Sequence, residues 1–272
     1  MSQDIATIML PLFVPGDRPE RFGKAQAAGP DAVILDLEDA VAPQSKAGAR
    51  AGLADAIAAM PPHVPLLVRI NAAGTDWHRD DLAAMRDLPL CAILLPKAEA
   101  PQDVLRVAEV TGKPVIALVE SALGLHRAEA LAEAAMRLAF GSIDYAADLA
   151  MGHTRESLLM ARARLVLASR LAGRPAPIDG VTTAIRDAQA MATDCAHAVE
   201  MGFGGKLLIH PAQVAPARAG FAPTAAELDW AGRVLAAAAS GDAALTVEGA
   251  MVDAPVIARA RQIRQRAGQE DA

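Results

Sequence analysis

The chain has 272 residues, of which 53% are hydrophobic and 21% are charged. These fractions are typical of a folded globular protein and exclude an intrinsically disordered one. Only 3% of the residues are aromatic and the formal net charge is −6, which disfavours a protein that stacks bases on aromatic side chains or holds a polyanion on a basic surface. We therefore expect no nucleic-acid partner.

The sequence also lacks the signals of secretion and of membrane insertion. No apolar run approaches the roughly 20 residues that a membrane span needs. The apolar N-terminal stretch has no basic segment before it and no cleavage signal after it. The two cysteines, Cys91 and Cys195, have neither disulfide-framework nor zinc-site spacing. These features predict a cytoplasmic protein with no membrane partner.

Short apolar runs alternate with longer Ala-rich segments along most of the chain. The runs predict eight strands, at 7–14, 32–38, 65–71, 92–96, 114–120, 137–141, 176–180 and 206–210. Segments of helical pattern follow the first seven strands, at 18–28, 44–60, 77–85, 102–111, 124–135, 155–171 and 185–201. The strands are near-continuous apolar runs, as burial on both faces of a parallel sheet requires. Eight such units favour an α/β fold of the (β/α)₈ TIM-barrel type.

The remaining segment has a different organisation. It predicts a helix at 225–239, a short segment at 245–252 and a basic helix at 255–267. We therefore expect a barrel domain at 1–222 and a C-terminal extension of helices and a lid segment at 223–272.

Charged and polar side chains gather at the carboxyl ends of the predicted strands. They are Asp36, Glu38, Asp39, Arg69, Asn71, Lys97, Glu120, Asp144, Asp179 and His210. The loops after these ends build the active face of a TIM barrel. The alternative is that each charge only marks the point where a strand emerges into water.

Glu120 and Asp144 follow adjacent predicted strands, so their carboxylates can face one space. Two like charges held close repel unless a cation neutralises both. Oxygen ligands that leave places for water and substrate suit Mg²⁺. The alternative is that each carboxylate pairs with a nearby Arg or Lys.

Arg69 follows three apolar residues on a predicted strand, where a guanidinium needs an anionic partner. Its planar fork matches the carboxylate of a substrate. An internal salt bridge to Glu38 or Asp39 is the alternative.

With these residues in place, the chain resembles the citrate lyase β-subunit-like (CitE-like) proteins of the HpcH/HpaI aldolase/citrate lyase family. The resemblance extends over nearly the whole sequence and rests on segments 13–18, 34–41, 68–71, 95–97, 119–122, 140–145, 205–211 and 249–255. It implies a (β/α)₈ barrel that assembles as a trimer or a hexamer. It also implies a Mg²⁺-dependent lyase that acts on a 3-hydroxyacyl-CoA such as malyl-CoA or citramalyl-CoA. The enzyme would cleave this thioester into an acyl-CoA and a 2-oxo acid (glyoxylate or pyruvate), or form it from them.

The resemblance implies roles for individual residues. Glu120 and Asp144 would bind the metal, and Glu38 and Asp39 would orient metal-bound waters. Arg69 would hold the oxygen groups of the substrate and steady developing charge. The remaining substrate contacts would come from backbone N–H groups around Gly141 and Ser142, and from Arg18 and Lys97.

The resemblance also assigns Asp253 as the base that removes the α-proton of the acyl thioester. The alternative is a helix N-cap, since Pro255 follows. Ile143 stands where many family members have an acidic residue, which is typical of the shorter CitE-like branch and argues against a true citrate lyase β subunit acting on an acyl-carrier thioester. Two further hypotheses are a class II pyruvate aldolase acting on free hydroxy-oxo acids, and a non-catalytic subunit that kept the barrel.

Overall fold

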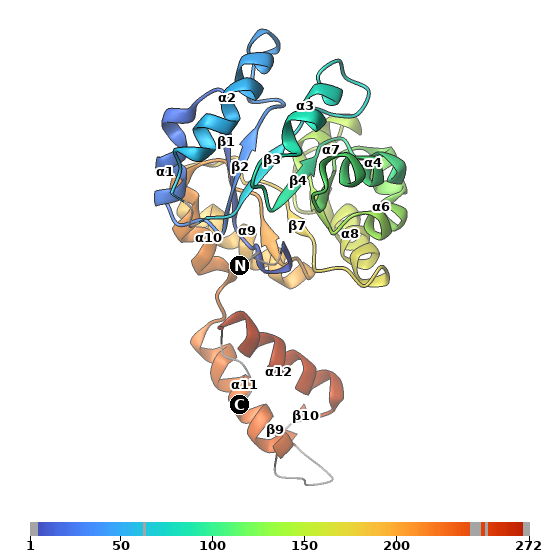
Figure 1. Ribbon diagram of the computed structural model, residues 1–272. Helices are drawn as coiled ribbons and strands as arrows, with labels where there is room; N and C mark the ends of the chain where they lie inside the picture. The colour runs from blue at the N-terminus through green and yellow to red at the C-terminus, as the bar shows by residue number, and fades with distance from the viewer. Residues whose placement is uncertain (1–4, 62–63, 240–245, 248–249, 269–272) are drawn as a thin grey trace. The chain divides into compact units, whose positions relative to one another are not determined.

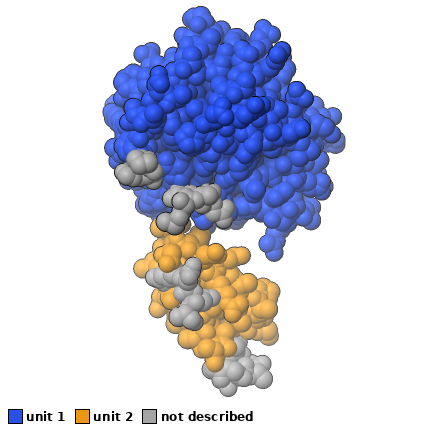
Figure 2. All heavy atoms as spheres, viewed as in Figure 1, with its two compact units in different colours: residues 1–220 blue, residues 221–272 orange. Residues whose placement is uncertain are grey.

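The computed structural model describes residues 5–61, 64–239, 246–247 and 250–268. The chain divides into two compact units, Met1–Gly220 and Phe221–Ala272 (Figure 2). We retain the predicted domain division, 1–222 and 223–272, as a proposal.

The first unit is built on eight parallel strands in sequence order, with helices around them (Figure 1). The strands are β1 (Pro11–Pro15), β2 (Ala32–Asp36), β3 (Leu66–Arg69), β4 (Ala92–Leu95), β5 (Val115–Val119), β6 (Arg137–Phe140), β7 (Ile178–Asp179) and β8 (Gly205–Lys206). The segment after β8 returns to β1, because the Phe13 N–H donates to Leu208 O at 2.8 Å and the Leu208 N–H donates to Pro11 O at 2.9 Å. The sheet is thus a closed barrel, which confirms the predicted (β/α)₈ fold.

Ten helices of the described chain accompany or follow these strands. They are α1 (Phe22–Ala27), α2 (Lys46–Ala58), α3 (His78–Met85), α4 (Pro101–Thr111), α5 (Ala122–His126), α6 (Ala128–Ala134), α7 (Ser142–Asp148), α8 (Leu159–Leu171), α9 (Ala188–Met201) and α10 (Val214–Phe221). Local sequence sets their ends: α4 begins with Pro101 in the first turn and ends at Gly112, whose φ is +65°. The described chain contains no helix with the length and apolar character of a membrane span.

The inside of the barrel is a packed apolar core. Side chains from most of the strands form it, among them Ile34, Leu67, Leu94, Ile116, Leu118 and Ile178, all nearly inaccessible to solvent. Every residue of β2 and β5 is buried, since a strand of a barrel has the core on one side and helices on the other. The core fills the interior, so polar chemistry is confined to the ends of the barrel.

Among the differences between the predicted and the observed elements, two concern residues predicted for the site. The strand at 137–141 ends at Phe140, and the unpredicted seven-residue helix α7 follows at once, so Asp144 lies on a helix. The predicted strand 206–210 is shorter, because His210 begins a 3₁₀ turn as a capping-box residue with Gln213.

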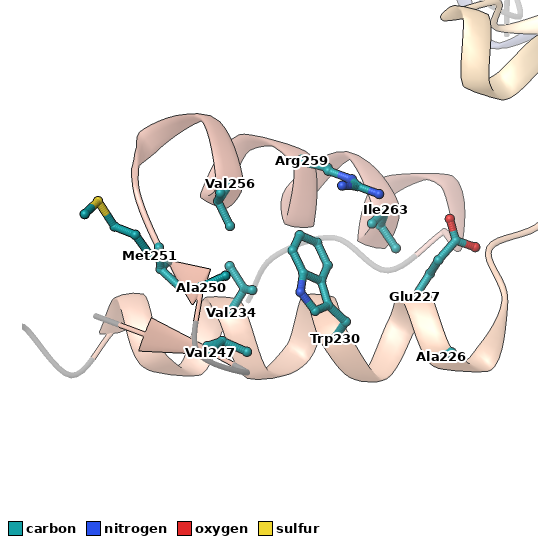
Figure 3. A pocket seen from close by; sticks show the side chains of 11 residues that line it. Ala226, Glu227, Trp230, Val234, Val247, Ala250, Met251, Val256, Arg259 and Ile263 are labelled. Atoms are coloured by element: carbon teal, nitrogen blue, oxygen red, sulfur yellow. The ribbon is translucent and has the colours of Figure 1, made fainter. Parts of the chain in front are cut away.

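The second unit contains α11 (Ala225–Ala239), the short antiparallel pair β9 (Thr246–Val247) and β10 (Ala250–Met251), and α12 (Ala254–Arg266). Its own small core includes Ala231, Val234, Val252 and Ile263. Beside this core lies a cavity of about 500 Å³, where the Arg259 guanidinium stacks 5.2 Å from the centre of the Trp230 ring (Figure 3).

Candidate active site

A cavity of about 430 Å³ lies at the carboxyl ends of the barrel strands. Five charged residues line it: Asp36, Asp39, Arg69, Glu120 and Asp144. Gly141 and Ser142 line it as well, together with an apolar set that includes Phe13, Phe140, Ile143 and Val181. The cavity thus brings together five of the ten residues that strand ends predicted as a site.

Glu120 is a buried carboxyl group with one free oxygen. Its Oε1 accepts a hydrogen bond from the Lys97 N–H at 2.6 Å, and its Oε2 has no hydrogen-bond partner among the described residues. Burial, assisted by the nearby charges of Glu38 and Asp144, raises its pKa to about 8. An unsatisfied buried carboxyl oxygen is costly, and a cation that takes it as a ligand removes that cost.

Two local features give Glu120 its place. Lys97 has a left-handed backbone with φ +47°, unusual for a residue with a side chain, and this conformation presents its N–H to Glu120. A Cβ at Gly141 would lie 2.3 Å from Glu120 Oε2, so only glycine leaves room for this carboxylate. The Gly141 N–H itself donates to Val119 O at 2.9 Å and is not free for a substrate.

Asp144 lies in the first turn of α7, is partly buried and lines the same cavity as Glu120. Both carboxylates line the cavity, and the buried Glu120 Oε2 has no hydrogen-bond partner among the described residues. This pair of oxygen donors fits a hard divalent cation such as Mg²⁺. The predicted alternative is that an Arg or Lys pairs with each carboxylate. Among the described residues, no Arg or Lys forms an ion pair with Glu120 or Asp144.

Arg69 is held by Asp36, the last residue of β2, and by Glu38 in the loop that follows. Its Nε and Nη2 donate to the two oxygens of Asp36 at 2.7 and 2.6 Å, and its Nη1 lies 3.0 Å from Glu38. Burial would lower its pKa, but the hydrogen bonds and charge of Asp36 and the charge of Glu38 outweigh burial and raise it. The guanidinium also stacks 4.9 Å from the centre of the Phe13 ring, which fixes its plane at the cavity wall.

Lys97 and Glu38 form a second ion pair beside Arg69. The Lys97 Nζ donates to Glu38 Oε1, while Glu38 is buried and Lys97 is half-exposed. Burial raises the pKa of Glu38, although Arg69 and Lys97 oppose this rise. The ammonium group of Lys97 is thus paired with Glu38, and its predicted contact with substrate or CoA stays a prediction.

The other predicted residues lie less centrally. Asp39 lines the cavity and is largely exposed, with its carboxylate 3.9 Å from Arg69 Nη1. Arg18 is exposed, lies 4.0 Å from Asp17 and does not line the cavity. Asp253 belongs to the second unit, where its carboxylate caps α12 by accepting the Val256 N–H at 3.1 Å.

Sequence reasoning missed two residues that organise this site. The first is Asp36 as the partner of Arg69, although the parallel register pairs the two directly across β2 and β3. The second is Lys46, whose buried Nζ donates to the Leu37 and Glu38 carbonyls at 2.8 and 2.6 Å and fixes the loop after β2. Strand-end position points to Asp36, whereas the sequence has no signal that sets Lys46 apart from a surface lysine.

Comparisons with known proteins identify the family. Residues 9–211 match the family model described as HpcH/HpaI aldolase/citrate lyase. A citrate lyase subunit beta-like protein of Mycobacterium tuberculosis is 39% identical, with 95% of each chain covered. A (3S)-malyl-CoA thioesterase of Cereibacter sphaeroides is 36% identical, with 94% of this chain and 93% of that protein covered.

A solved structure shows the same likeness in three dimensions. The crystal structure of CitE from Mycobacterium tuberculosis, in complex with magnesium, acetoacetate and coenzyme A, matches with a TM-score of 0.87 and 37% sequence identity. The match covers 97% of this chain and 99% of that one. These findings confirm the predicted resemblance and the predicted class of enzyme. The chain belongs to the HpcH/HpaI aldolase/citrate lyase family.

Proposed function

We propose that this protein is a Mg²⁺-dependent lyase that cleaves a 3-hydroxyacyl-CoA into an acyl-CoA and a 2-oxo acid, glyoxylate or pyruvate, or forms it from these two compounds. The observation that carries the proposal is the buried, unpartnered Oε2 of Glu120 in the same cavity as Asp144. The magnesium and coenzyme A of the related CitE complex support it. A cytoplasmic location and assembly as a trimer or hexamer belong to the same proposal.

Glu120 and Asp144 are the residues that would hold the metal. Bound Mg²⁺ would polarise the carboxylate and hydroxyl oxygens of the substrate and favour loss of the hydroxyl proton. Asp39, exposed at the cavity edge, and Glu38, held beside it by Arg69 and Lys97, would orient the metal-bound waters.

Other residues of the chain would stabilise charge, bind the oxo-acid carboxylate and transfer the proton. Arg69, fixed by Asp36, offers a preorganised positive charge to the oxygens that gain charge when the carbon–carbon bond breaks. The Ser142 N–H, at the start of α7, is the backbone donor that remains for the oxo-acid carboxylate. In the direction of synthesis, Asp253 takes the α-proton of the acyl thioester. In the direction of cleavage, it returns that proton.

The test is a panel of acetyl-CoA and propionyl-CoA, each with glyoxylate, pyruvate or oxaloacetate, in Mg²⁺ and in EDTA. We expect one pair to condense in Mg²⁺ only, and Glu120→Gln and Asp144→Asn to abolish the reaction. Free thiol measured in parallel shows whether hydrolysis follows. Turnover of free hydroxy-oxo acids that does not need Asp253 would instead identify the pyruvate aldolase. Absence of turnover with every CoA thioester would contradict the proposal.

A further inference from the structure

A buried cluster of three charged residues lies beside the cavity, between the barrel and α8. Asp179 ends β7, Lys206 lies on β8 and Arg162 comes from α8, and all three are buried. The Arg162 Nε donates to one oxygen of Asp179 at 2.9 Å, and the Lys206 Nζ donates to the other at 3.1 Å. The Lys206 Nζ also donates to the Gly180 carbonyl at 2.6 Å.

This cluster carries more positive than negative charge. Two cations share one carboxylate, and the Arg162 Nη1 is buried without a hydrogen-bond partner in the part of the chain that the structure describes. The nearby carboxylate Asp194 is already bound by Arg155 at 2.7 Å and by the Thr182 hydroxyl at 2.7 Å. A buried guanidinium nitrogen without a partner costs stability. The excess charge therefore calls for an explanation beyond packing.

The cluster lies directly behind one wall of the cavity. The Arg162 guanidinium is 5.9 Å from the centre of the ring of Phe140, which lines the cavity. Ser142, another lining residue, packs so closely on Gly180, the residue after β7, that a Cβ there would lie 2.1 Å from its Oγ. The next residue of the same strand end, Val181, lines the cavity too. The excess charge is thus one layer of side chains from the cavity.

The carboxylates at the cavity have the reverse balance. Five acids lie on or beside it, Asp36, Glu38, Asp39, Glu120 and Asp144, whereas Arg69 and Lys97 pair with some of them and Lys46 donates to backbone carbonyls. The acids therefore attract a divalent cation, and the cluster behind β7 attracts an anion. Charges inside a protein act over longer distances than charges in water, because little solvent screens them.

We propose that Arg162 is a positioning residue, whose uncompensated charge draws the carboxylate end of the substrate toward the β7–β8 side of the cavity without touching it. This inference rests on the proposed function, since it assumes that an oxo-acid anion enters this cavity beside Mg²⁺. It predicts opposite effects on the two ligands. Removal of the charge weakens binding of the anion and strengthens binding of the cation.

The experiment compares Arg162→Met with Arg162→Lys and the native protein. Calorimetry measures the affinity for Mg²⁺ alone and then, in saturating Mg²⁺, for pyruvate, glyoxylate and the uncharged analogue pyruvamide. We expect Arg162→Met to weaken oxo-acid binding about 3- to 10-fold and to tighten Mg²⁺ binding about 2- to 5-fold. Arg162→Lys keeps both affinities, and pyruvamide binding stays unchanged in every variant.

Two further variants control for structural damage. Arg164→Met removes an exposed charge on the same helix, one that pairs with Glu129 at 3.0 Å, and is expected to change neither affinity. Lys206→Met brings the cluster to the same zero charge by another route and is expected to repeat the Arg162→Met result. Because Arg162→Met keeps the Asp179–Lys206 pair but removes the donor to one buried oxygen of Asp179, its melting temperature is expected to fall, and the titrations are made well below it.

The outcomes separate the inference from the proposed function. Unchanged affinities in Arg162→Met, or a joint loss of both, would overturn the positioning role while native binding of Mg²⁺ and oxo acid still supports the lyase. A native protein that binds neither ligand would instead overturn the proposed function, and this inference with it.

Discussion

Glu120 is a buried carboxyl group whose pKa, about 8, lies well above its usual value of 4.5, mainly because of burial. Between these two values the folded protein holds a proton that the unfolded chain has lost. The free energy of unfolding of the metal-free protein therefore falls as pH rises through this window, by up to about 1.4 kcal/mol per pH unit. Urea unfolding in EDTA from pH 5 to 8 is expected to show this slope, and Mg²⁺ to offset it.

The matched variant for this prediction is Glu120→Gln, which cannot titrate. Its unfolding free energy is expected to depend less on pH than that of the native protein and to respond little to Mg²⁺. Equal slopes in the two proteins would show that Glu120 ionises normally.

Gly141 gives a second prediction at a single residue. A methyl group there would overlap Glu120 Oε2, so Gly141→Ala is expected to displace this carboxylate and lower the affinity for Mg²⁺ at least about tenfold. Gly152→Ala is the control, because its new Cβ would meet nothing closer than 3.8 Å. Calorimetric titration with Mg²⁺ measures both variants. A native affinity in Gly141→Ala would contradict the assignment of Glu120 as a ligand.

The helix α12 raises the question of whether Asp253 caps its end, acts as a base, or does both. Asp253→Asn keeps an oxygen that can cap the helix, whereas Asp253→Ala removes both functions. We expect both variants to slow α-proton exchange of the acyl-CoA by about 100-fold or more, and only the alanine variant to destabilise the second unit, by about 1 kcal/mol. NMR in D₂O and circular dichroism give the two readouts.

Native exchange in Asp253→Asn would leave Asp253 with the capping role alone. Loss of helix signal in both variants to the same extent would show that the cap needs the carboxylate charge, since an N-terminal carboxylate also favours the helix dipole.

Elements were predictable from the sequence where they are long and regular. All five residues of β5 are apolar, and so are the first four of β2, which ends with Asp36. The hydrophobic pattern alone identifies such runs. The helix α7 was missed because its seven residues are too few for a helical period to stand out. Its position matters, because it carries Asp144 and Ser142 toward the cavity.

The site was predictable to the extent that a parallel barrel brings the carboxyl ends of all its strands to one face. This rule found Arg69, Glu120 and Asp144 together. It could not find the role of Asp179, whose strand has two residues and whose side chain faces α8 instead of the cavity. Two residues are too few for the alternation of faces to show which way a side chain points.

At the scale of the whole barrel, closure depends on the seam between β8 and β1. The Lys206 N–H donates to Met9 O at 2.8 Å, and a Cβ at Gly205 would lie 2.4 Å from that same oxygen. Gly205→Ala is therefore expected to lower the free energy of unfolding by about 2–4 kcal/mol, because backbone atoms on both sides must move. Urea denaturation followed by circular dichroism checks this.

Gly52→Ala is the control for this prediction, since Gly52 lies exposed within α2 and a Cβ there would touch nothing. It is expected to stabilise the protein by about 0.5–1 kcal/mol, as alanine does in helices. If Gly205→Ala proved as stable as the native protein, the seam would be more compliant than its contacts indicate.

The same seam has a consequence for how the chain is made. The first strand reaches the ribosome exit long before the residues at 205–208 that complete its hydrogen bonds. Until they emerge, one side of β1 presents unpaired backbone groups to the surroundings, and unpaired strand edges invite pairing with other chains. A transcript cut short before Gly205 therefore yields a product that is prone to aggregate.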